Sequence, residues 1–525
     1  MIRKLIYILL ITLLFNAINE LKAEVKEGDT VNFWSVTYVD WFKGTLPPQE
    51  RITAVCKKVG VNCYFFLDTA ATNPVQQTAI VEFVNRFDND YYGRLTDLYG
   101  PCPDALDHDS RIYILAIKPT WWGGYFDPAQ QMPDSMVSRL WGVHSSEHEI
   151  IYISADHVQQ GRESIIAHEF GHMLGWEQDH SPEPPDKPTI YWEDTWVDEG
   201  FSTFADTYLN AHIDDSGYLL NSFFNGPEKL SLINWTGYLN YNSSLLFMLY
   251  MYEHFGKDVY LKALLRNQLN GIAGVESTVQ SLGYNLSFDK IFENWTLANY
   301  LDRKIFNDSV YYYNHFDFTS RFHRYEHSNY PVIVSDSIST YSSDFIKLNS
   351  TGSLINLQLT FNGNVNSKFR IALILMNSAD SSVIGVIDVP LNDSNVAKYD
   401  FIKFGKDYDK AVLVIMNTDK ALKEFQSTDY SYTLTPSMVE VKDNKQILPS
   451  KIYYSKIYDA IYLDLPDKTN NKKQVLLYDV NGKIIESVNT LNDQIKLDTG
   501  SLSKGLYIAI VRNGVNIYSL PVMVY

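Results

Sequence analysis

Two neighbouring stretches, EIIYISA at residues 149–155 and SIIAHEFGHML at residues 164–174, contain the strongest structural signal in this chain. The first is a short apolar run, which is typical of a buried strand. In the second, apolar residues recur at helical spacing up to Gly175, which predicts a helix over residues 162–174. The two stretches therefore predict a strand that leads into a helix.

The predicted helix carries His168 and His172 four residues apart, with Glu169 between them. Residues at this spacing project from one face of a helix, so both imidazoles can hold a single zinc ion at about 2.0–2.1 Å. A carboxylate beside that ion can take a proton from zinc-bound water, whose pKa the metal lowers towards neutrality. The three residues therefore predict a hydrolytic zinc site with Glu169 as the general base. Two core or solvated histidines with an incidental glutamate are the alternative.

The third metal ligand decides which kind of site this is, because a catalytic zinc ion usually has three protein ligands and a water molecule. Glu199 lies in TWVDEGFSTFAD, a stretch that predicts a helix capped at its N-terminus by Thr195. His180 is the other candidate, because the metzincin pattern HExxHxxGxxH is matched through Gly175 but its last histidine comes two residues late. Both candidates stay open on the residues alone, and Glu199 is preferred.

The segment around Glu199 resembles the WLNEGF motif of the aminopeptidase-N family and similar motifs in hyicolysin-like peptidases, which are gluzincins. The resemblance implies that Glu199 is the third zinc ligand and that Asp206, seven residues later, orients a ligand histidine. YNSSLLFMLYMYEHFG resembles the stretch of that family whose leading tyrosine stabilises the oxyanion, which implies this role for Tyr241. Tyr238 is a close competitor, and a surface aspartate and a packing tyrosine are the simpler alternatives.

The aminopeptidase-N family binds the free amine of its substrate with a GxMEN segment, and this chain contains no such segment. The resemblance therefore implies an endopeptidase that acts on protein or peptide substrates, rather than an exopeptidase. The EIIYISA strand is a candidate sheet edge that pairs with an extended substrate backbone, with an ordinary internal strand as the alternative.

Several domains are expected, because 525 residues exceed the size of one typical core. A β-rich opening followed by helical patterns predicts a two-lobed α+β zincin domain over residues 24–325, with the helical lobe at 195–325. Short alternating runs such as SSDFIKL and INLQLTF then predict an all-β sandwich at 326–440. Two Asn-Gly hairpin turns predict a second all-β sandwich at 441–525.

Two segments predict export. Residues 1–23 have basic residues before an apolar run that is too short to span a bilayer, which predicts a cleaved signal peptide and no lasting membrane insertion. Near the other end, YDVNGK, then LSKGLY, then an apolar strand resemble the C-terminal sorting domain of type IX secretion substrates. This resemblance implies contact with the secretion machinery and a secreted or cell-surface protein.

Charge and cysteine content restrict the expected partners and scaffold. A formal net charge of −18 repels nucleic-acid phosphates, so nucleic acid is not an expected partner. Cys56, Cys63 and Cys102 are too few for a disulfide-dense scaffold. They would allow one bridge and one free thiol, and we interpret them as structural cysteines.

A turn-rich segment, GPCPDALDHDS at residues 100–110, contains Asp104, Asp107 and Asp109. Three clustered carboxylates could bind calcium, because that ion prefers oxygen ligands. The distal glutamate of an EF-hand is absent, however, so a solvated turn before the next strand is the preferred interpretation.

A rival interpretation from another class is a secreted binding protein or adhesin whose zincin lobe is inactive. Such a relic would be expected to lack the base or a metal ligand. Here the base, both histidines and an acidic third candidate are all present. The sequence therefore favours an enzyme with zinc as its cofactor.

Overall fold

The computed structural model of this chain describes residues 24–36, 48–71, 75–104, 107, 109–118, 123–162, 164–180, 193–210, 226–304, 310–314, 323–350, 355–379, 381–437, 451–455, 460–464, 472–479, 483–492, 494–498, 502–503, 505–513 and 516–524. The predicted signal peptide, residues 1–23, lies outside these ranges. The chain divides into two compact units, Met1–Pro188 with Phe201–Ala211, and Thr189–Gly200 with His212–Tyr525. Within the described ranges, no helix is long and apolar enough to cross a membrane.

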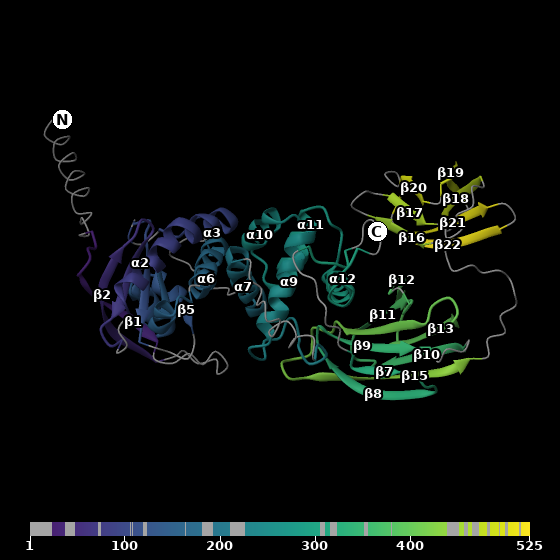
Figure 1. Cartoon of the computed structure of the whole chain (residues 1–525), viewed down its shortest axis with the longest axis horizontal. Coiled ribbons are helices and arrows are strands. Elements are labelled where there is room, and N and C mark those ends of the chain that lie inside the picture. Colours follow the sequence, from purple (N-terminus) through teal and green to yellow (C-terminus); the bar gives the residue numbers. More distant parts are fainter. Residues whose placement is uncertain are drawn as a thin grey trace, which may run out of the picture. The chain divides into compact units, whose positions relative to one another are not determined.

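A six-stranded mixed sheet organises the first unit, with strand order β1-β2-β3-β4-β6-β5. Figure 1 labels β1, β2 and β5 of this sheet. β3, β4 and β6 run parallel, and the other neighbouring pairs run antiparallel. Every residue of β4 and β6 is buried, which explains why both are continuous apolar runs. The strands are β1 (Thr30–Val36), β2 (Gln49–Val59), β3 (Cys63–Asp68), β4 (Ile112–Ile117), β5 (Gly124–Phe126) and β6 (Ile150–Ser154).

The strand predicted from EIIYISA is internal, so the hypothesis that it forms a sheet edge is wrong. It is β6, and it pairs with β4 on one side and with β5 on the other. Tyr125 of β5 lies opposite Tyr152 of β6, and their rings stack with centroids 4.2 Å apart. Among the described strands, β5 therefore forms the edge of the sheet on this side.

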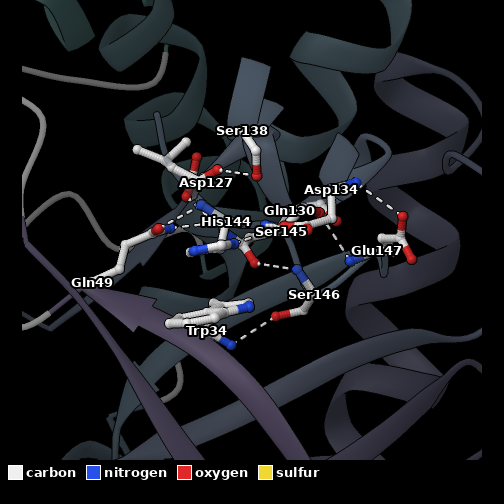
Figure 2. A network of polar contacts seen from close by, with 11 residues as sticks. Trp34, Gln49, Asp127, Gln130, Asp134, Ser138, His144, Ser145, Ser146 and Glu147 are labelled. Carbon is white, nitrogen blue, oxygen red and sulfur yellow. Dashed lines mark hydrogen bonds and ion pairs between the residues drawn. The ribbon is translucent and has the colours of Figure 1, made fainter. Parts of the chain in front are cut away.

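A polar network fixes the connection between β5 and β6 (Figure 2). This connection contains helix α4 (Asp134–Trp141). The buried side chain of Gln130 donates to Asp127 at 3.0 Å and accepts from the backbone of Ser146 at 2.9 Å. The hydroxyl of Ser146 in turn accepts from the backbone of Trp34 in β1 at 2.9 Å. The network thereby connects the end of β5 to β1, the strand at the other end of the strand order.

Helix α6 (Ser164–His180) is longer than the predicted helix, which was expected to end at residue 174. Gly175 does not end it, and the side chain of Gln178 donates to the carbonyl of Pro101 at 3.1 Å. This tertiary contact offsets part of the roughly 1 kcal/mol that a glycine costs inside a helix. The other helices of this unit are α2 (Gln77–Arg86), α3 (Tyr92–Tyr99) and α5 (Ala155–Gln159), and a π-helical turn, Phe87–Tyr91, joins α2 to α3.

Helix α7 (Thr195–Asn210) contributes residues to both units. The backbone of Asp198 donates to the carbonyl of Asp194 at 3.1 Å, which is the first hydrogen bond of the helix. The cap is therefore Asp194, one residue before the predicted cap Thr195. The preceding residue, Glu193, accepts from the backbone of Gly271 at 2.7 Å. The helices of the second unit are α9 (Asn240–His254), α10 (Asp258–Leu265), α11 (Gly271–Ser281) and α12 (Phe288–Leu301).

Two sheets then pack face to face as a β-sandwich, with orders β13-β10-β15-β8 and β12-β11-β14-β9-β7. Nearly every residue of β11 and β14 is buried. The sandwich core covers one face of their sheet, and α12 contacts this sheet through the ion pair of Glu293 with Arg370 of β11. Tyr300 of α12 stacks on Phe345 of β9 with ring centroids 5.2 Å apart. The strands are β7 (Tyr325–His327), β8 (Val332–Ser339), β9 (Ser342–Asn349), β10 (Ile355–Gly363), β11 (Phe369–Met376), β12 (Val383–Val389), β13 (Val396–Phe404), β14 (Lys410–Asn417) and β15 (Ser427–Ser437).

A second all-β region follows, with sheets ordered β16-β17-β20 and β19-β18-β21-β22 around a separate apolar core. The chain is thus multidomain and combines helices with several β-sheets. The remaining strands are β16 (Lys451–Ser455), β17 (Ala460–Asp464), β18 (Lys473–Asp479), β19 (Ile484–Thr490), β20 (Gln494–Asp498), β21 (Gly505–Asn513) and β22 (Asn516–Val524).

Candidate metal centre

Helix α6 presents two imidazoles to one point. The Nε2 atoms of His168 and His172 lie 3.2 Å apart, and the two rings meet edge to face. Two nitrogen ligands bound to a tetrahedral zinc ion at about 2.0–2.1 Å are separated by about 3.3 Å. The spacing of the two nitrogens therefore suits a shared metal ion.

A carboxylate from α7 completes the group. Ligand atoms of His168, His172 and Glu199 all lie within 4.8 Å of one another. In the described part of the chain, no other set of three histidine, cysteine, aspartate or glutamate side chains converges in this way. Two imidazole nitrogens and a carboxylate oxygen are a donor set that zinc and related divalent metals accept. The three residues could therefore bind a metal.

Two glycines that sequence reasoning did not single out let the helices approach closely. A Cβ at Gly171 of α6 would lie 3.1 Å from the Cα of Ser202 and 3.2 Å from the Cβ of Ala205, both on α7. A Cβ at Gly200 would lie 3.3 Å from the backbone oxygen of Ser244 on α9. The glycines inside HEFGH and DEGF are thus explained by helix packing next to the metal ligands.

Glu169 is almost fully buried, with 4% of its surface exposed. Its neighbour is the edge strand: a Cβ added at Gly124 of β5 would lie 3.1 Å from the Cγ of Glu169 and 2.6 Å from the carbonyl oxygen of Tyr152. Only glycine fits at this position without displacing one of these neighbours. A strand edge therefore lies directly beside the expected base, a feature that the sequence analysis missed.

The two tyrosine candidates occupy different environments. The hydroxyl of Tyr241, in the first turn of α9, donates to Oε1 of Glu199 at 3.3 Å. Its ring packs edge to face against Trp235, with centroids 4.8 Å apart. Tyr238 is 66% exposed. Tyr241 is accordingly the tyrosine that contacts a member of the metal-binding group.

Asp206 and His180 are placed only in part. Asp206 is half-buried on α7, two turns after Glu199, and its role in orienting a histidine stays a prediction. His180 is the last residue of α6, and its side chain lies outside the described residues. Eight residues of continuous helix separate the backbone of His180 from that of His172 by about 12 Å. The continuous helix therefore places the backbone of His180 far from that of His168 and His172.

The aspartates of the 100–110 turn take part in separate contacts. Asp109 pairs with Arg111 at 2.9 Å and accepts from the hydroxyl of Tyr64 at 2.5 Å. Asp107 lies 3.1 Å from the Nδ1 atom of His148, and only 2% of its side chain is exposed. The interpretation of this segment as a simple solvated turn is therefore wrong for Asp107.

All three cysteines are free thiols. Cys56 and Cys63 are buried in the first unit, and burial raises the pKa of each thiol, to about 11 for Cys56. Burial also raises the pKa of Cys102, and nearby carboxylates add to this effect. Thiols held protonated in this way suit structural positions, and no bridge forms among them.

Comparison with known structures and sequences gives matches to parts of the chain. No curated protein sequence matches it. A beta-glucuronidase from Faecalibacterium prausnitzii aligns at 10% identity and a TM-score of 0.14, over 37% of this chain and 38% of its own. The CBM51-2 and INT domains of ZmpB from Clostridium perfringens align at 9% identity and a TM-score of 0.14, over 36% of this chain and 73% of theirs. A mitogen from Yersinia pseudotuberculosis aligns at 17% identity and a TM-score of 0.15, over 22% and 92%.

One family match is specific. Residues 456–524 match the family described as the secretion system C-terminal sorting domain. This confirms the sorting domain expected from the YDVNGK and LSKGLY segments, and it implies interaction with the type IX secretion machinery. The C-terminal region of the chain is a type IX secretion sorting domain, which indicates export to the cell surface or the medium.

Proposed function

We propose that this chain is an exported zinc-dependent endopeptidase of the gluzincin type. The observation that carries the proposal is the convergence of His168, His172 and Glu199 within 4.8 Å, with Glu169 in the same helical turn as His168. Metal sites that only stabilise a fold are usually closed by four protein ligands, whereas three ligands leave a position for water. A three-ligand group beside a buried carboxylate therefore favours hydrolysis.

Zinc bound by these residues would supply Lewis-acid chemistry, polarising a carbonyl and lowering the pKa of a water molecule. Glu169 would take the proton of the attacking water and pass it to the leaving amine. Tyr241, whose hydroxyl donates to Glu199 at 3.3 Å, would turn that donor towards the developing oxyanion. Burial of Glu169 keeps bulk water from competing for its carboxylate.

The edge strand supports a peptide as substrate. β5 pairs with β6 on one side only among the described strands, so its other side offers backbone donors and acceptors to an extended chain. Gly124 brings this strand against Glu169. A peptide added alongside β5 would therefore run past the base with chain on both sides of the scissile bond, as an endopeptidase requires.

Metal content and casein cleavage of the purified full-length protein test the proposal together. The expected result is about one zinc ion per chain, cleavage that a chelator abolishes, and recovery when zinc is restored. A protein that binds zinc but cleaves no unfolded protein would favour the rival, an adhesin or binding protein with an inactive lobe. A protein that binds no zinc would overturn the assignment of the metal centre.

A further inference from the structure

Asn240, the first residue of α9, has a side chain that is fully buried and that the proposed chemistry does not use. Its Oδ1 atom accepts from the backbone N–H groups of Thr236 at 2.9 Å and Gly237 at 3.1 Å, and from the hydroxyl of Thr236 at 3.0 Å. Its Nδ2 atom donates to the carbonyls of Ser231 at 2.8 Å and Asn234 at 3.2 Å. Both amide hydrogens of the side chain are thus used, and these contacts all reach the chain just before α9.

The segment that leads into α9, residues 231–239, also supports Tyr241. Its Trp235 packs edge to face against Tyr241, with ring centroids 4.8 Å apart. The backbone of Tyr241 donates to the carbonyl of Tyr238 at 3.3 Å, and the hydroxyl of Tyr241 donates to Oε1 of Glu199 at 3.3 Å. The ring and the backbone of Tyr241 therefore both contact the 231–239 segment.

The same segment is hydrogen-bonded to the sandwich. The backbone of Leu232 donates to the carbonyl of Tyr341, between β8 and β9, at 2.9 Å. The side chain of Asn234 donates to the carbonyl of Leu422, between β14 and β15, at 3.2 Å. All of these residues belong to the second unit. The segment is therefore held by Asn240 on the α9 side and by two loops of the sandwich.

The hydrogen bonds of Asn240 give the segment one arrangement, because leaving a buried partner unpaired costs free energy. A catalytic hydroxyl needs such support, since a misplacement of about 1 Å can cost about a hundredfold in rate. We propose that Asn240 is a positioning residue, which fixes the 231–239 segment and through it the hydroxyl of Tyr241. The inference rests on the proposed hydrolysis, in which Tyr241 stabilises the oxyanion. Asn240 itself is not among the three convergent metal ligands.

The first test replaces Asn240 with aspartate, which keeps an acceptor and removes both donated hydrogen bonds. In full-length zinc-loaded protein, Asn240→Asp should lower kcat on a fluorogenic peptide by about tenfold, with little change in KM or zinc content. The decisive measurement is the same change in a Tyr241→Phe background. There Asn240→Asp should lower kcat further by less than about twofold, because the hydroxyl that it positions is already absent.

Asn267→Asp is the matched control. The Nδ2 atom of Asn267 donates to the hydroxyls of Ser277 at 2.6 Å and Thr278 at 2.8 Å, among others, so this change likewise removes an amide donor. These bonds join the end of α10 to α11 and do not involve the 231–239 segment. Asn267→Asp should therefore lower Tm about as much as Asn240→Asp does, and it should leave kcat near that of the unmodified protein.

A second variant decides the question if Asn240→Asp does not fold. Asn234 is only half-buried, so its replacement disturbs the core less. Asn234→Asp removes the hydrogen bond to Leu422 of the sandwich and should lower kcat by about threefold. In the Tyr241→Phe background this loss should also become smaller.

The outcomes separate this inference from the function on which it rests. No cleavage of casein or peptide by the unmodified protein would overturn the proposed peptidase, and the positioning role with it. Cleavage by the unmodified protein with unchanged kcat in Asn240→Asp, or equal losses of kcat in Asn240→Asp and Asn267→Asp, would overturn the positioning role alone. A loss that is just as large in the Tyr241→Phe background would also overturn it, because Asn240 would then act independently of Tyr241.

Discussion

Buried carboxylates occur around α6 and between α12 and the sandwich. The charged partners of these carboxylates differ between the two regions. Around α6, Glu199 gathers with two histidines, and burial together with nearby acidic residues raises the pKa of Glu149 to about 7. Between α12 and the sandwich, Glu293 is 98% buried and pairs with both Lys290 and Arg370. Burial alone therefore does not identify a functional carboxylate in this protein.

The identity of the nearest charged partner separates the two cases. A buried acid with a lysine or arginine beside it is electrically satisfied and can hold two elements together. Arg324 does this between Glu228 at 2.9 Å and Asp336 at 3.0 Å. An acid that gathers with imidazoles or other acids instead creates a place where a cation is favourable. The following changes test this distinction, beginning with the largest expected effect.

Glu169→Ala should lower the rate of casein cleavage by about a hundred- to ten-thousandfold, because it removes the general base. Zinc content should stay near that of the unmodified protein, since Glu169 is not among the three convergent ligands. Turnover and metal content are measured on the same preparation, with Glu82→Gln as the control. Turnover like that of the unmodified protein would rule out the proposed role of Glu169.

Glu199→Ala should weaken zinc binding by at least about a hundredfold, because one of three ligands is lost. His180→Ala should retain the metal and most activity, since the continuous helix carries residue 180 about 12 Å beyond His172. Competition with a chromogenic chelator measures both affinities. The reverse pattern would support the metzincin scheme and refute Glu199 as a ligand.

Tyr241→Phe should lower kcat by about a hundredfold with little change in KM, because it removes one hydrogen bond to the transition state. Tyr238→Phe is a matched control three residues away on an exposed side chain, and it should change neither constant appreciably. Steady-state kinetics on a fluorogenic peptide separate the two constants. Equal losses in both variants would point to a packing effect and against an oxyanion donor.

Glu293→Ala should destabilise the protein by about 3 kcal/mol, because it leaves Lys290 and Arg370 without their shared buried partner. It should leave zinc content unchanged, since the residue belongs to the group that only joins α12 to the sandwich. Urea unfolding and metal analysis give the two measurements. Loss of zinc with unchanged stability would contradict the distinction drawn between the two regions.

Sequence reasoning found the parts of the site that lie within one element and missed those that depend on neighbours. The spacing of His168 and His172 fixes their common face, because helical periodicity is local. The position of Glu199 came only from a family resemblance, since nothing local tells which helix packs on α6. The edge strand β5 has three residues, too few for any periodic pattern. The sheet order, which makes EIIYISA internal, likewise follows from long-range pairing.

The smallest expected effect is on how the stability of the sandwich depends on pH. Asp344 is fully buried, and its burial, with Glu228 and Asp336 nearby, raises its pKa to about 7 despite the hydrogen bond from Tyr430. The ordinary aspartate value is near 3.8, so the folded state holds a proton that the unfolded state releases between about pH 4 and 7. Stability from this group is therefore greatest at low pH and is lost as pH rises through 7.

Between pH 5 and pH 8 the loss should amount to roughly 2 kcal/mol. Asp344→Asn, which mimics the protonated side chain, should make the pH-dependent loss of stability smaller by this amount, whereas Asp393→Asn, an exposed loop residue of the same sandwich, should leave it unchanged. Urea midpoints at the two pH values measure the slope for each protein. A slope that persists unchanged in Asp344→Asn would assign the pH dependence to other groups. A loss that becomes smaller by roughly 2 kcal/mol would show that Asp344 is a buried acid compensated by a proton. That is a third way of burying a carboxylate, beside pairing with a metal or with an arginine.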